Sequence, residues 1–200
     1  MKTALYLAHL NPVTNAHIEI INELKNSADI VKVMPVIFKS GINEINSKSF
    51  PFNFEIREKM LKSVFGNSIL ITNDYTFFAP FKKYMPPVLS LKSWKLRKQI
   101  LADVKGDFFS YTGDKAERHM LKIYRLKPKL GQRKLLSASS VKENLYESAL
   151  GRESSWKKDV PESVGRIIEE NWEIIEKFSG LEDQTNRVLG MKFPKDGWSK

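Results

Sequence analysis

The chain has no cysteine, only three histidines and no apolar run that approaches the length of a bilayer span. The absence of cysteine excludes a disulfide framework and a thiolate metal site. His9, His17 and His119 are too scattered to predict a zinc site, so we expect no metal held by protein side chains. Met1 and Lys2 lead into a short strand pattern and show no signal-peptide pattern, so a cytoplasmic protein without a membrane partner is the simplest expectation.

The 200 residues have an ordinary globular composition, with 42% hydrophobic and 28% charged residues, and a net charge of +10. This length fits one domain with appendages. The basic residues are spread in ones, twos and threes, and there is no arginine-rich tail. Spread positive charge favours ligands that carry phosphate over dedicated nucleic-acid binding.

Short apolar runs alternate with helical patterns, which predicts an α/β fold with a parallel sheet of about five strands flanked by helices. Strands are predicted at residues 3–7, 30–38, 69–72 and 107–112, and helices at 14–24, 54–65, 94–101, 115–123, 137–145 and 161–178. Pro35 requires an edge, a bulge or an early break in its strand. We expect a Rossmann-like domain over residues 1–150, a C-terminal helix over 151–180 packed on that domain, and a polar tail over 181–200.

Residues 8–21, A-H-L-N-P-V-T-N-A-H-I-E-I-I, join the first strand to the first helix. Thr14 or Asn15 can cap this helix, and Thr14 shares a face with His17 three residues later. A hydroxyl and an imidazole beside the free N–H groups of a helix start form a candidate phosphate site. The simpler alternative is a helix cap followed by a solvated histidine.

Residues 136–145, L-S-A-S-S-V-K-E-N-L, form a second helix start with a hydroxyl cluster. Ser137 to Ser140 can cap this helix, and Ser140 with Glu143 fits a capping box. Ser139 and Lys142 are three apart on one face, where they could bind the β- and γ-phosphates of a nucleotide. Taken alone, a serine-rich helix start is usually only a cap.

Together these segments resemble a known family. P-V-T-N-A-H is similar to the T/H-x-G-H signature of the nucleotidyltransferase superfamily, the adenylyl- and cytidylyltransferases, with Ala16 in place of the usual glycine. L-S-A-S-S-V-K is similar to the family's second signature, I-S-x-[ST]-x-[IV]-[RK]. F-N-F-E-I-R, residues 52–57, resembles a third segment, F-S-x-x-x-R. The order and separation of the first two signatures give the resemblance its weight.

The resemblance implies transfer of AMP from ATP to a small phosphorylated acceptor, with release of pyrophosphate and with Mg²⁺ on the phosphates. It implies catalytic roles for His17, Thr14 and Lys142. We expect ATP contacts from His9, Asn11, Gly113, Asp114, Ser137 and Ser139, and acceptor contacts from Lys39, Arg57 and Trp94. Surface or packing roles are the alternatives for Lys39, Arg57 and Trp94.

Two acceptors remain open. Trp94, the helix after it and the strand that ends in Thr-Gly-Asp look like a nicotinamide- or nicotinate-mononucleotide adenylyltransferase. P-V-T-N-x-H and S-x-S-x-V-K-E look more like phosphopantetheine adenylyltransferase of coenzyme A synthesis. We favour the mononucleotide. A non-catalytic nucleotide- or RNA-binding relative is the alternative of another class.

The family resemblance also implies a homo-oligomer. The aromatic stretch 73–87 is expected to be an irregular loop that forms a lid or a subunit contact, because its phenylalanines would not stay fully exposed. The tail carries Met191, Phe193 and Trp198 as possible anchors to this domain or to a neighbouring subunit.

Overall fold

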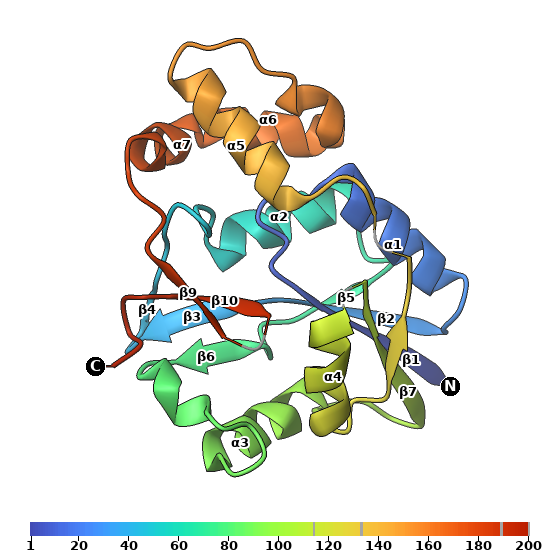
Figure 1. The fold of residues 1–200 in the computed structure, drawn as a ribbon. Coiled ribbons are helices and arrows are strands. Elements are labelled where there is room, and N and C mark those ends of the chain that lie inside the picture. The colour runs from blue at the N-terminus through green and yellow to red at the C-terminus, as the bar shows by residue number, and fades with distance from the viewer. Residues whose placement is uncertain (114, 133, 189, 200) are drawn as a thin grey trace.

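The computed structural model describes residues 1–113, 115–132, 134–188 and 190–199. A five-stranded parallel sheet with the order β5-β2-β1-β7-β8 forms its centre, and helices cover both faces (Figure 1). The strands of this sheet are β1 (Lys2–Ala8), β2 (Ile30–Pro35), β5 (Leu70–Ile71), β7 (Asp107–Thr112) and β8 (Pro128–Leu130). The helices are α1 (Asn15–Lys25), α2 (Phe54–Phe65), α3 (Leu91–Ile100), α4 (Lys115–Ile123), α5 (Ala138–Ala149), α6 (Glu162–Glu170) and α7 (Trp172–Ser179), with 3₁₀ turns η1 (Phe81–Tyr84) and η2 (Trp156–Asp159). The predicted α/β class is confirmed.

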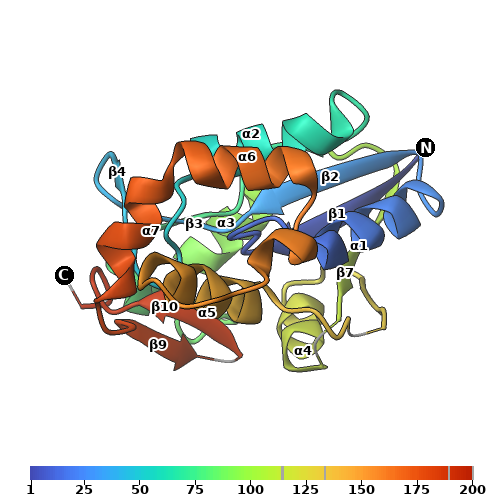
Figure 2. The same cartoon turned by 90° about the horizontal axis from the view of Figure 1, so that it is seen from above.

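Strand β1 is the central strand, and both of its faces are buried. Ala4 and Tyr6 pack into the core beneath α1, α2, α5, α6 and α7, which lie together over one face (Figure 2). Leu5 and Leu7 pack into a second core that includes residues of α3 and α4. Successive side chains of a strand point to opposite faces, so this apolar run fits a strand that is covered on both sides. The end of β1 therefore lies between two cores.

Residues 30–38, predicted as one strand, form two strands in two different sheets. The pairing of β2 with β1 ends at Pro35, because proline has no N–H to continue the ladder. Val36 then donates its N–H to the Ala8 carbonyl at 2.9 Å. The chain continues as β3 (Ile37–Ser40) in a second sheet of order β4-β3-β6, with β4 (Asn43–Glu44) and β6 (Thr76–Phe78). The single strand was wrong, and the early break at Pro35 is confirmed.

The aromatic stretch 73–87 is not an irregular loop, because it contains β6 and η1. Phe77 and Phe81 are buried in the second core and pack against Phe38 of β3, with ring centroids 5.7 and 5.4 Å apart. Phe78 is the phenylalanine of this stretch that remains exposed, at 41%. Most of the aromatic side chains in this stretch are therefore buried within the chain itself, and no subunit contact is needed to bury them.

The C-terminal helix predicted at residues 161–178 is broken into α6 and α7 at Asn171. Asn171 has φ −121° and ψ 32°, outside the helical region, and its side chain donates to the Ile167 carbonyl at 2.8 Å. Val164, Ile168 and Ile175 are nevertheless fully buried in the core shared with the rest of the domain, so this segment packs on the domain as predicted. Between α4 and α5 the chain also forms β8, a short edge strand that the sequence pattern did not indicate.

Two strands pair antiparallel where we expected a polar tail, β9 (Thr185–Val188) with β10 (Met191–Pro194), and we call them the C-terminal hairpin. Phe193 is fully buried in the second core, and Met191 and Trp198 pack against that core. The predicted anchors are thus confirmed, and they hold the tail on this domain. In the described part of the chain, no helix is long and apolar enough to cross a membrane.

Candidate active site

The loop that follows β1 joins the central strand to the first turn of α1, so it lies at the carboxyl edge of the parallel sheet, where open α/β sheets bind ligands. Thr14 is the N-cap of α1 and is buried. The backbone N–H of Thr14 donates to Nδ1 of His17 at 3.0 Å, and the Thr14 hydroxyl oxygen also lies 3.0 Å from Nδ1. The structure therefore brings together the hydroxyl and the imidazole that the sequence placed at this helix start.

This contact determines which nitrogen of His17 carries the proton. Because Nδ1 accepts the Thr14 N–H, the neutral ring is protonated at Nε2, which becomes a hydrogen-bond donor. Burial, and then the positive charge of Lys142, lower the pKa of His17 to about 4. The imidazole is consequently neutral at pH 7 and can donate a proton in a hydrogen bond without carrying charge.

Lys142 connects the second helix start to the first. Its ammonium group donates to the Asn11 carbonyl at 3.0 Å, across 131 residues of sequence. Burial, and then the charge of Lys192, lower the pKa of Lys142 to about 8, so the ammonium form still predominates at pH 7. The two signature segments thus meet at one loop.

The first turn of α5 is capped by one of the predicted serines, but without the predicted capping box. Ser137 is the N-cap, and its hydroxyl accepts the Ser140 N–H at 3.1 Å, so the predicted capping box of Ser140 with Glu143 was wrong. The box fails because the helix already begins at Ala138. Ser139 lies exposed in this first turn, beside free N–H groups of the helix start.

His9 lies directly after β1, and its ring stacks on Phe50 with centroids 4.8 Å apart and planes at 24°. Its Nδ1 is buried and has no hydrogen-bond partner among the described residues. Burial, followed by the nearby charges of Lys142, Arg57 and Lys192, lowers the pKa of His9 to about 3. His9 is therefore a neutral ring with a polar nitrogen that a ligand could satisfy.

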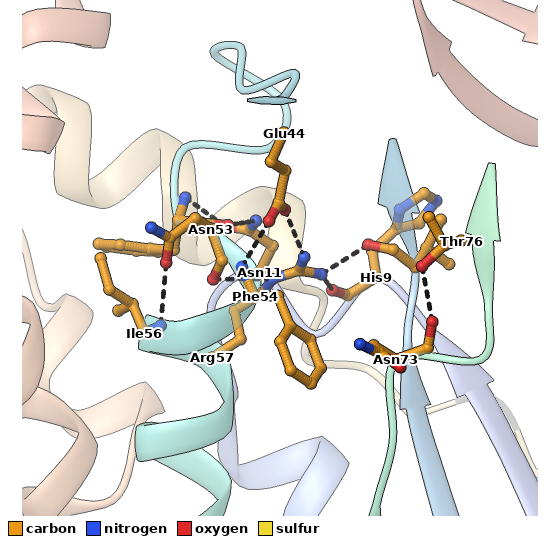
Figure 3. Close-up of polar contacts among 11 residues, drawn as sticks. His9, Asn11, Glu44, Asn53, Phe54, Ile56, Arg57, Asn73 and Thr76 are labelled. Atoms are coloured by element: carbon orange, nitrogen blue, oxygen red, sulfur yellow. Dashed lines mark hydrogen bonds and ion pairs between the residues drawn. The ribbon is translucent and has the colours of Figure 1, made fainter. Parts of the chain in front are cut away.

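Arg57, predicted to contact the acceptor, is buried and bonded to other parts of the protein. Its side chain is 2% exposed, and the guanidinium donates to the carbonyls of His9, Val36 and Asn53 and to Glu44 (Figure 3). The ion pair with Glu44 measures 2.8 Å. A guanidinium engaged in this way supports the loop after β1 and is not presented to a substrate. These contacts favour the packing role that was the alternative for Arg57, and the acceptor contact stays an untested prediction.

Asn11 also supports the loop through its side chain. The side-chain amide of Asn11 donates to the Phe52 carbonyl at 2.7 Å and accepts the Phe52 N–H at 3.1 Å, with no part of the residue exposed. The side chain of Asn11 therefore bridges the loop to the segment before α2, and the ATP contact from Asn11 stays a prediction. The Asn11 carbonyl remains at the site as the acceptor of the Lys142 ammonium.

A cavity of about 250 Å³ opens beside His9. Three parts of the chain form its wall: the ends of β1 and β2 with Tyr75, the region of α4, and the C-terminal hairpin. The lining residues are Ala8, His9, Val36, Tyr75, Glu117, Met120, Leu121, Tyr124, Arg187, Gly190 and Met191. Most of these side chains are apolar or aromatic, and the charged ones are Glu117 and Arg187. Such a wall suits a flat ring with a few polar substituents.

Lys39, Trp94 and Gly113 are not among the residues that line this cavity. Lys39 lies within β3 and is removed from the edge where β1 and β2 end, because the strand break at Pro35 carries it into the second sheet. Trp94 lies on α3 and donates its indole N–H to the Val88 carbonyl at 2.9 Å. Gly113 directly follows β7 at the carboxyl edge of the main sheet. Asp114 lies outside the described residues.

Sequence reasoning missed the two walls that complete the cavity. Glu117, Met120, Leu121 and Tyr124 are spaced at three, four and seven residues, so helical periodicity alone would have placed them on one face of α4. The hairpin residues carried no such signal.

Among the described residues, no group of three or more histidine, aspartate or glutamate side chains is arranged to hold a metal ion.

No protein-family model and no curated protein matches this chain. Several solved structures do match its fold. A bifunctional NMN adenylyltransferase/ADP ribose pyrophosphatase from Francisella tularensis aligns with a TM-score of 0.67 at 12% identity, over 89% of this chain and 52% of that one. The same Francisella protein has been solved with AMP and a manganese ion. The present chain spans about half the length of that protein.

Two further structures cover nearly the whole of their own chains. A putative nicotinate-nucleotide adenylyltransferase from Vibrio parahaemolyticus aligns with a TM-score of 0.57 at 14% identity, over 88% of this chain and 96% of that one. Plasmodium falciparum nicotinic acid mononucleotide adenylyltransferase, complexed with NaAD, aligns with a TM-score of 0.53 at 14% identity, over 86% and 98%. At these identities the likeness establishes the nucleotidyltransferase fold.

Proposed function

We propose that this chain, which has the nucleotidyltransferase fold, transfers AMP from MgATP to a small phosphorylated acceptor and releases pyrophosphate. The observation that carries the proposal is the hydrogen bond from Lys142 to the Asn11 carbonyl. It joins the start of α5 to the loop that also holds Thr14 and His17. Two helix N-termini, a neutral histidine donor and a lysine therefore converge where a triphosphate could bind.

In this mechanism an oxygen of the acceptor phosphate attacks the α-phosphorus of ATP in line, and the bond from that phosphorus to the bridging oxygen of pyrophosphate breaks. His17 donates a hydrogen bond from Nε2 to the charge that grows on the α-phosphate and the bridging oxygen. Lys142 and Ser139 bind the leaving pyrophosphate, with Thr14 beside the reacting phosphates. No protein group needs to form a covalent bond, because positioning and charge stabilisation supply the catalysis.

The wall of the cavity supports a mononucleotide acceptor. Its tyrosines, methionines and aliphatic side chains would cover a pyridine ring, and Glu117, His9 and Arg187 offer polar contacts at its edges. The solved structures with the same fold include adenylyltransferases named for nicotinamide and nicotinate mononucleotides. We therefore propose nicotinamide or nicotinate mononucleotide as the acceptor, with phosphopantetheine as the alternative.

The experiment measures pyrophosphate release from MgATP with each of three acceptors: nicotinamide mononucleotide, nicotinate mononucleotide and 4′-phosphopantetheine. His17→Ala removes the Nε2 donor and should lower the rate by about 10²- to 10³-fold, as for other lost donors to a transition-state oxyanion. Its melting temperature should change little, because the ring is only half-buried. His119→Ala, at an exposed position of α4, is the matched control and should keep full activity.

Each outcome separates the alternatives. Release with one mononucleotide supports the proposal, whereas release only with phosphopantetheine would support the other acceptor. A protein that binds ATP but releases no pyrophosphate with any of the three would be a nucleotide binder. Equal activity of His17→Ala and the wild-type protein would contradict the proposed mechanism.

A further inference from the structure

The C-terminal hairpin forms one wall of the cavity beside His9, through Arg187, Gly190 and Met191. The family signatures do not include this segment, and the resemblance predicted no contact from it. In Figure 1 the hairpin crosses beside β3, where Phe193 packs on Phe38. A segment at the very end of the chain is thus brought to the site that the first residues of the chain create.

The hairpin is held in a defined position. Phe193 is fully buried, with its ring 5.4 Å from that of Phe38 and 5.2 Å from that of Phe77. The Tyr75 hydroxyl lies 3.4 Å from the Met191 sulfur inside the cavity wall. Beyond β10, the Phe81 N–H donates to the Gly197 carbonyl at 2.8 Å. A hairpin anchored at these points can place a side chain reproducibly at the site.

Two cations face each other on this hairpin. Arg187 of β9 pairs directly with Lys192 of β10, so both side chains share one face. Like charges in directly opposite positions destabilise a strand pair. Lys192 is compensated by Asp183 at 3.1 Å and also donates to the Ser49 hydroxyl. Arg187 makes no hydrogen bond or ion pair with any residue that the structure describes.

Arg187 is also the cation of the cavity wall. The other charged side chain there, Glu117, already accepts a hydrogen bond from the Thr112 hydroxyl. An arginine that lines a cavity, faces a second cation and lacks a protein partner has the character of an oxyanion receptor, because its planar guanidinium matches carboxylate and phosphate geometry.

We propose that Arg187 binds an oxyanion of the acceptor and that the C-terminal hairpin thereby contributes to acceptor recognition. This assignment rests on the proposed function. Two acceptor groups have the required chemistry: the phosphate that both mononucleotides carry, and the ring carboxylate that only nicotinate mononucleotide carries. The two acceptors therefore distinguish the two sources.

The test compares KM and kcat for both mononucleotides, using the full-length wild-type chain and Arg187→Gln, with pyrophosphate release as the readout. Loss of one charge-assisted contact should raise the acceptor KM by about tenfold or more, with kcat and the KM for ATP unchanged. A rise only for nicotinate mononucleotide assigns the carboxylate, and an equal rise for both acceptors assigns the phosphate. Arg187→Lys should recover part of the affinity, since it keeps the charge but loses the planar fork.

Arg166→Gln is the matched control, because Arg166 is an exposed arginine of α6 whose ion pair with Glu162 lies within that helix. It should leave every constant unchanged. Acceptor KM values for Arg187→Gln within twofold of wild type would overturn the assignment while leaving the proposed function intact. A parallel loss of ATP affinity and melting temperature would show a structural role for Arg187 and would also overturn it. A wild-type chain that releases no pyrophosphate with either mononucleotide would contradict the proposed acceptor itself, and this assignment with it.

Discussion

At the scale of single residues, burial gives His17 and Lys142 different charge states at neutral pH. Both pKa values are lowered, to about 4 for His17 and about 8 for Lys142. A lowered pKa leaves histidine uncharged at pH 7 but leaves most of the lysine charged, because the lysine value starts much higher. The site therefore pairs a neutral hydrogen-bond donor with a cation, which suits an anionic substrate with negative charge on several oxygens.

Lys142 predicts a pH dependence. The ammonium form exists below its pKa, so ATP binding should be lost as pH rises through about 8. We expect kcat/KM for ATP to fall towards a slope of about tenfold per pH unit above pH 8. Lys142→Arg keeps its charge at these pH values and should remove the alkaline decline. A wild-type profile that stays flat to pH 10 would contradict the role given to Lys142.

A substitution of Arg57 distinguishes a role in stabilising the loop after β1 from a role in binding the substrate. Arg57→Met removes four hydrogen bonds and leaves Glu44 and three carbonyls without this donor. Breaking such a buried pair should lower the free energy of unfolding by about 3–5 kcal/mol, measured by urea denaturation. Arg152→Met, at a surface ion pair, should change it by less than about 1 kcal/mol. An unchanged unfolding free energy together with a raised acceptor KM would restore the substrate role.

At the scale of elements, the sequence predicted those features that depend only on neighbouring residues, namely strands and helix caps. The apolar run of β1 is typical of a strand that is buried on both faces, and the caps near Thr14 and Ser137 follow from the free N–H groups at a helix start. Arg57 could not be placed in the same way. Its partners are backbone carbonyls that only the assembled loop brings together, so nothing in the residues near Arg57 distinguishes it from a surface arginine.

The C-terminal hairpin was missed for a different reason. Its two strands have four residues each, and Phe193 is the fully buried residue of the pair. So short a run gives no clear alternation of apolar and polar residues. The break of the strand pattern at Pro35 was foreseeable from the missing N–H of proline, but the second sheet that follows depends on pairing with β6, which is distant in sequence.

The hairpin also predicts a stability effect. Phe193→Ala should lower the free energy of unfolding by about 3–5 kcal/mol, because it empties a fully buried ring position among Phe38, Phe77 and Phe81. Phe78→Ala, at a position with 41% exposure, is the control and should cost clearly less. Urea denaturation of both variants measures the difference. Equal, small effects would show that the tail does not stabilise this domain.

At the scale of the whole molecule, a parallel sheet brings distant segments to one edge. Three distant segments meet beside the end of β1. The Lys142 ammonium joins the segment near residue 140 to the Asn11 carbonyl, and the segment near residue 190 lines the same cavity as His9. The order of the two signature segments along the chain was enough to predict the first two of these partners. The third depends on tertiary packing that has no sequence signature, and it brings the cation Arg187 to the cavity wall.

The most direct test of the central claim is to identify the product by mass spectrometry after incubation with MgATP and either mononucleotide. Adenylyl transfer predicts a dinucleotide, in which AMP has been joined to the acceptor phosphate, together with pyrophosphate, and His17→Ala should suppress both. Formation of ADP and a phosphorylated acceptor would contradict the account, because attack would then occur at the γ-phosphorus. Recovery of unchanged acceptor and ATP with both mononucleotides would contradict it as well.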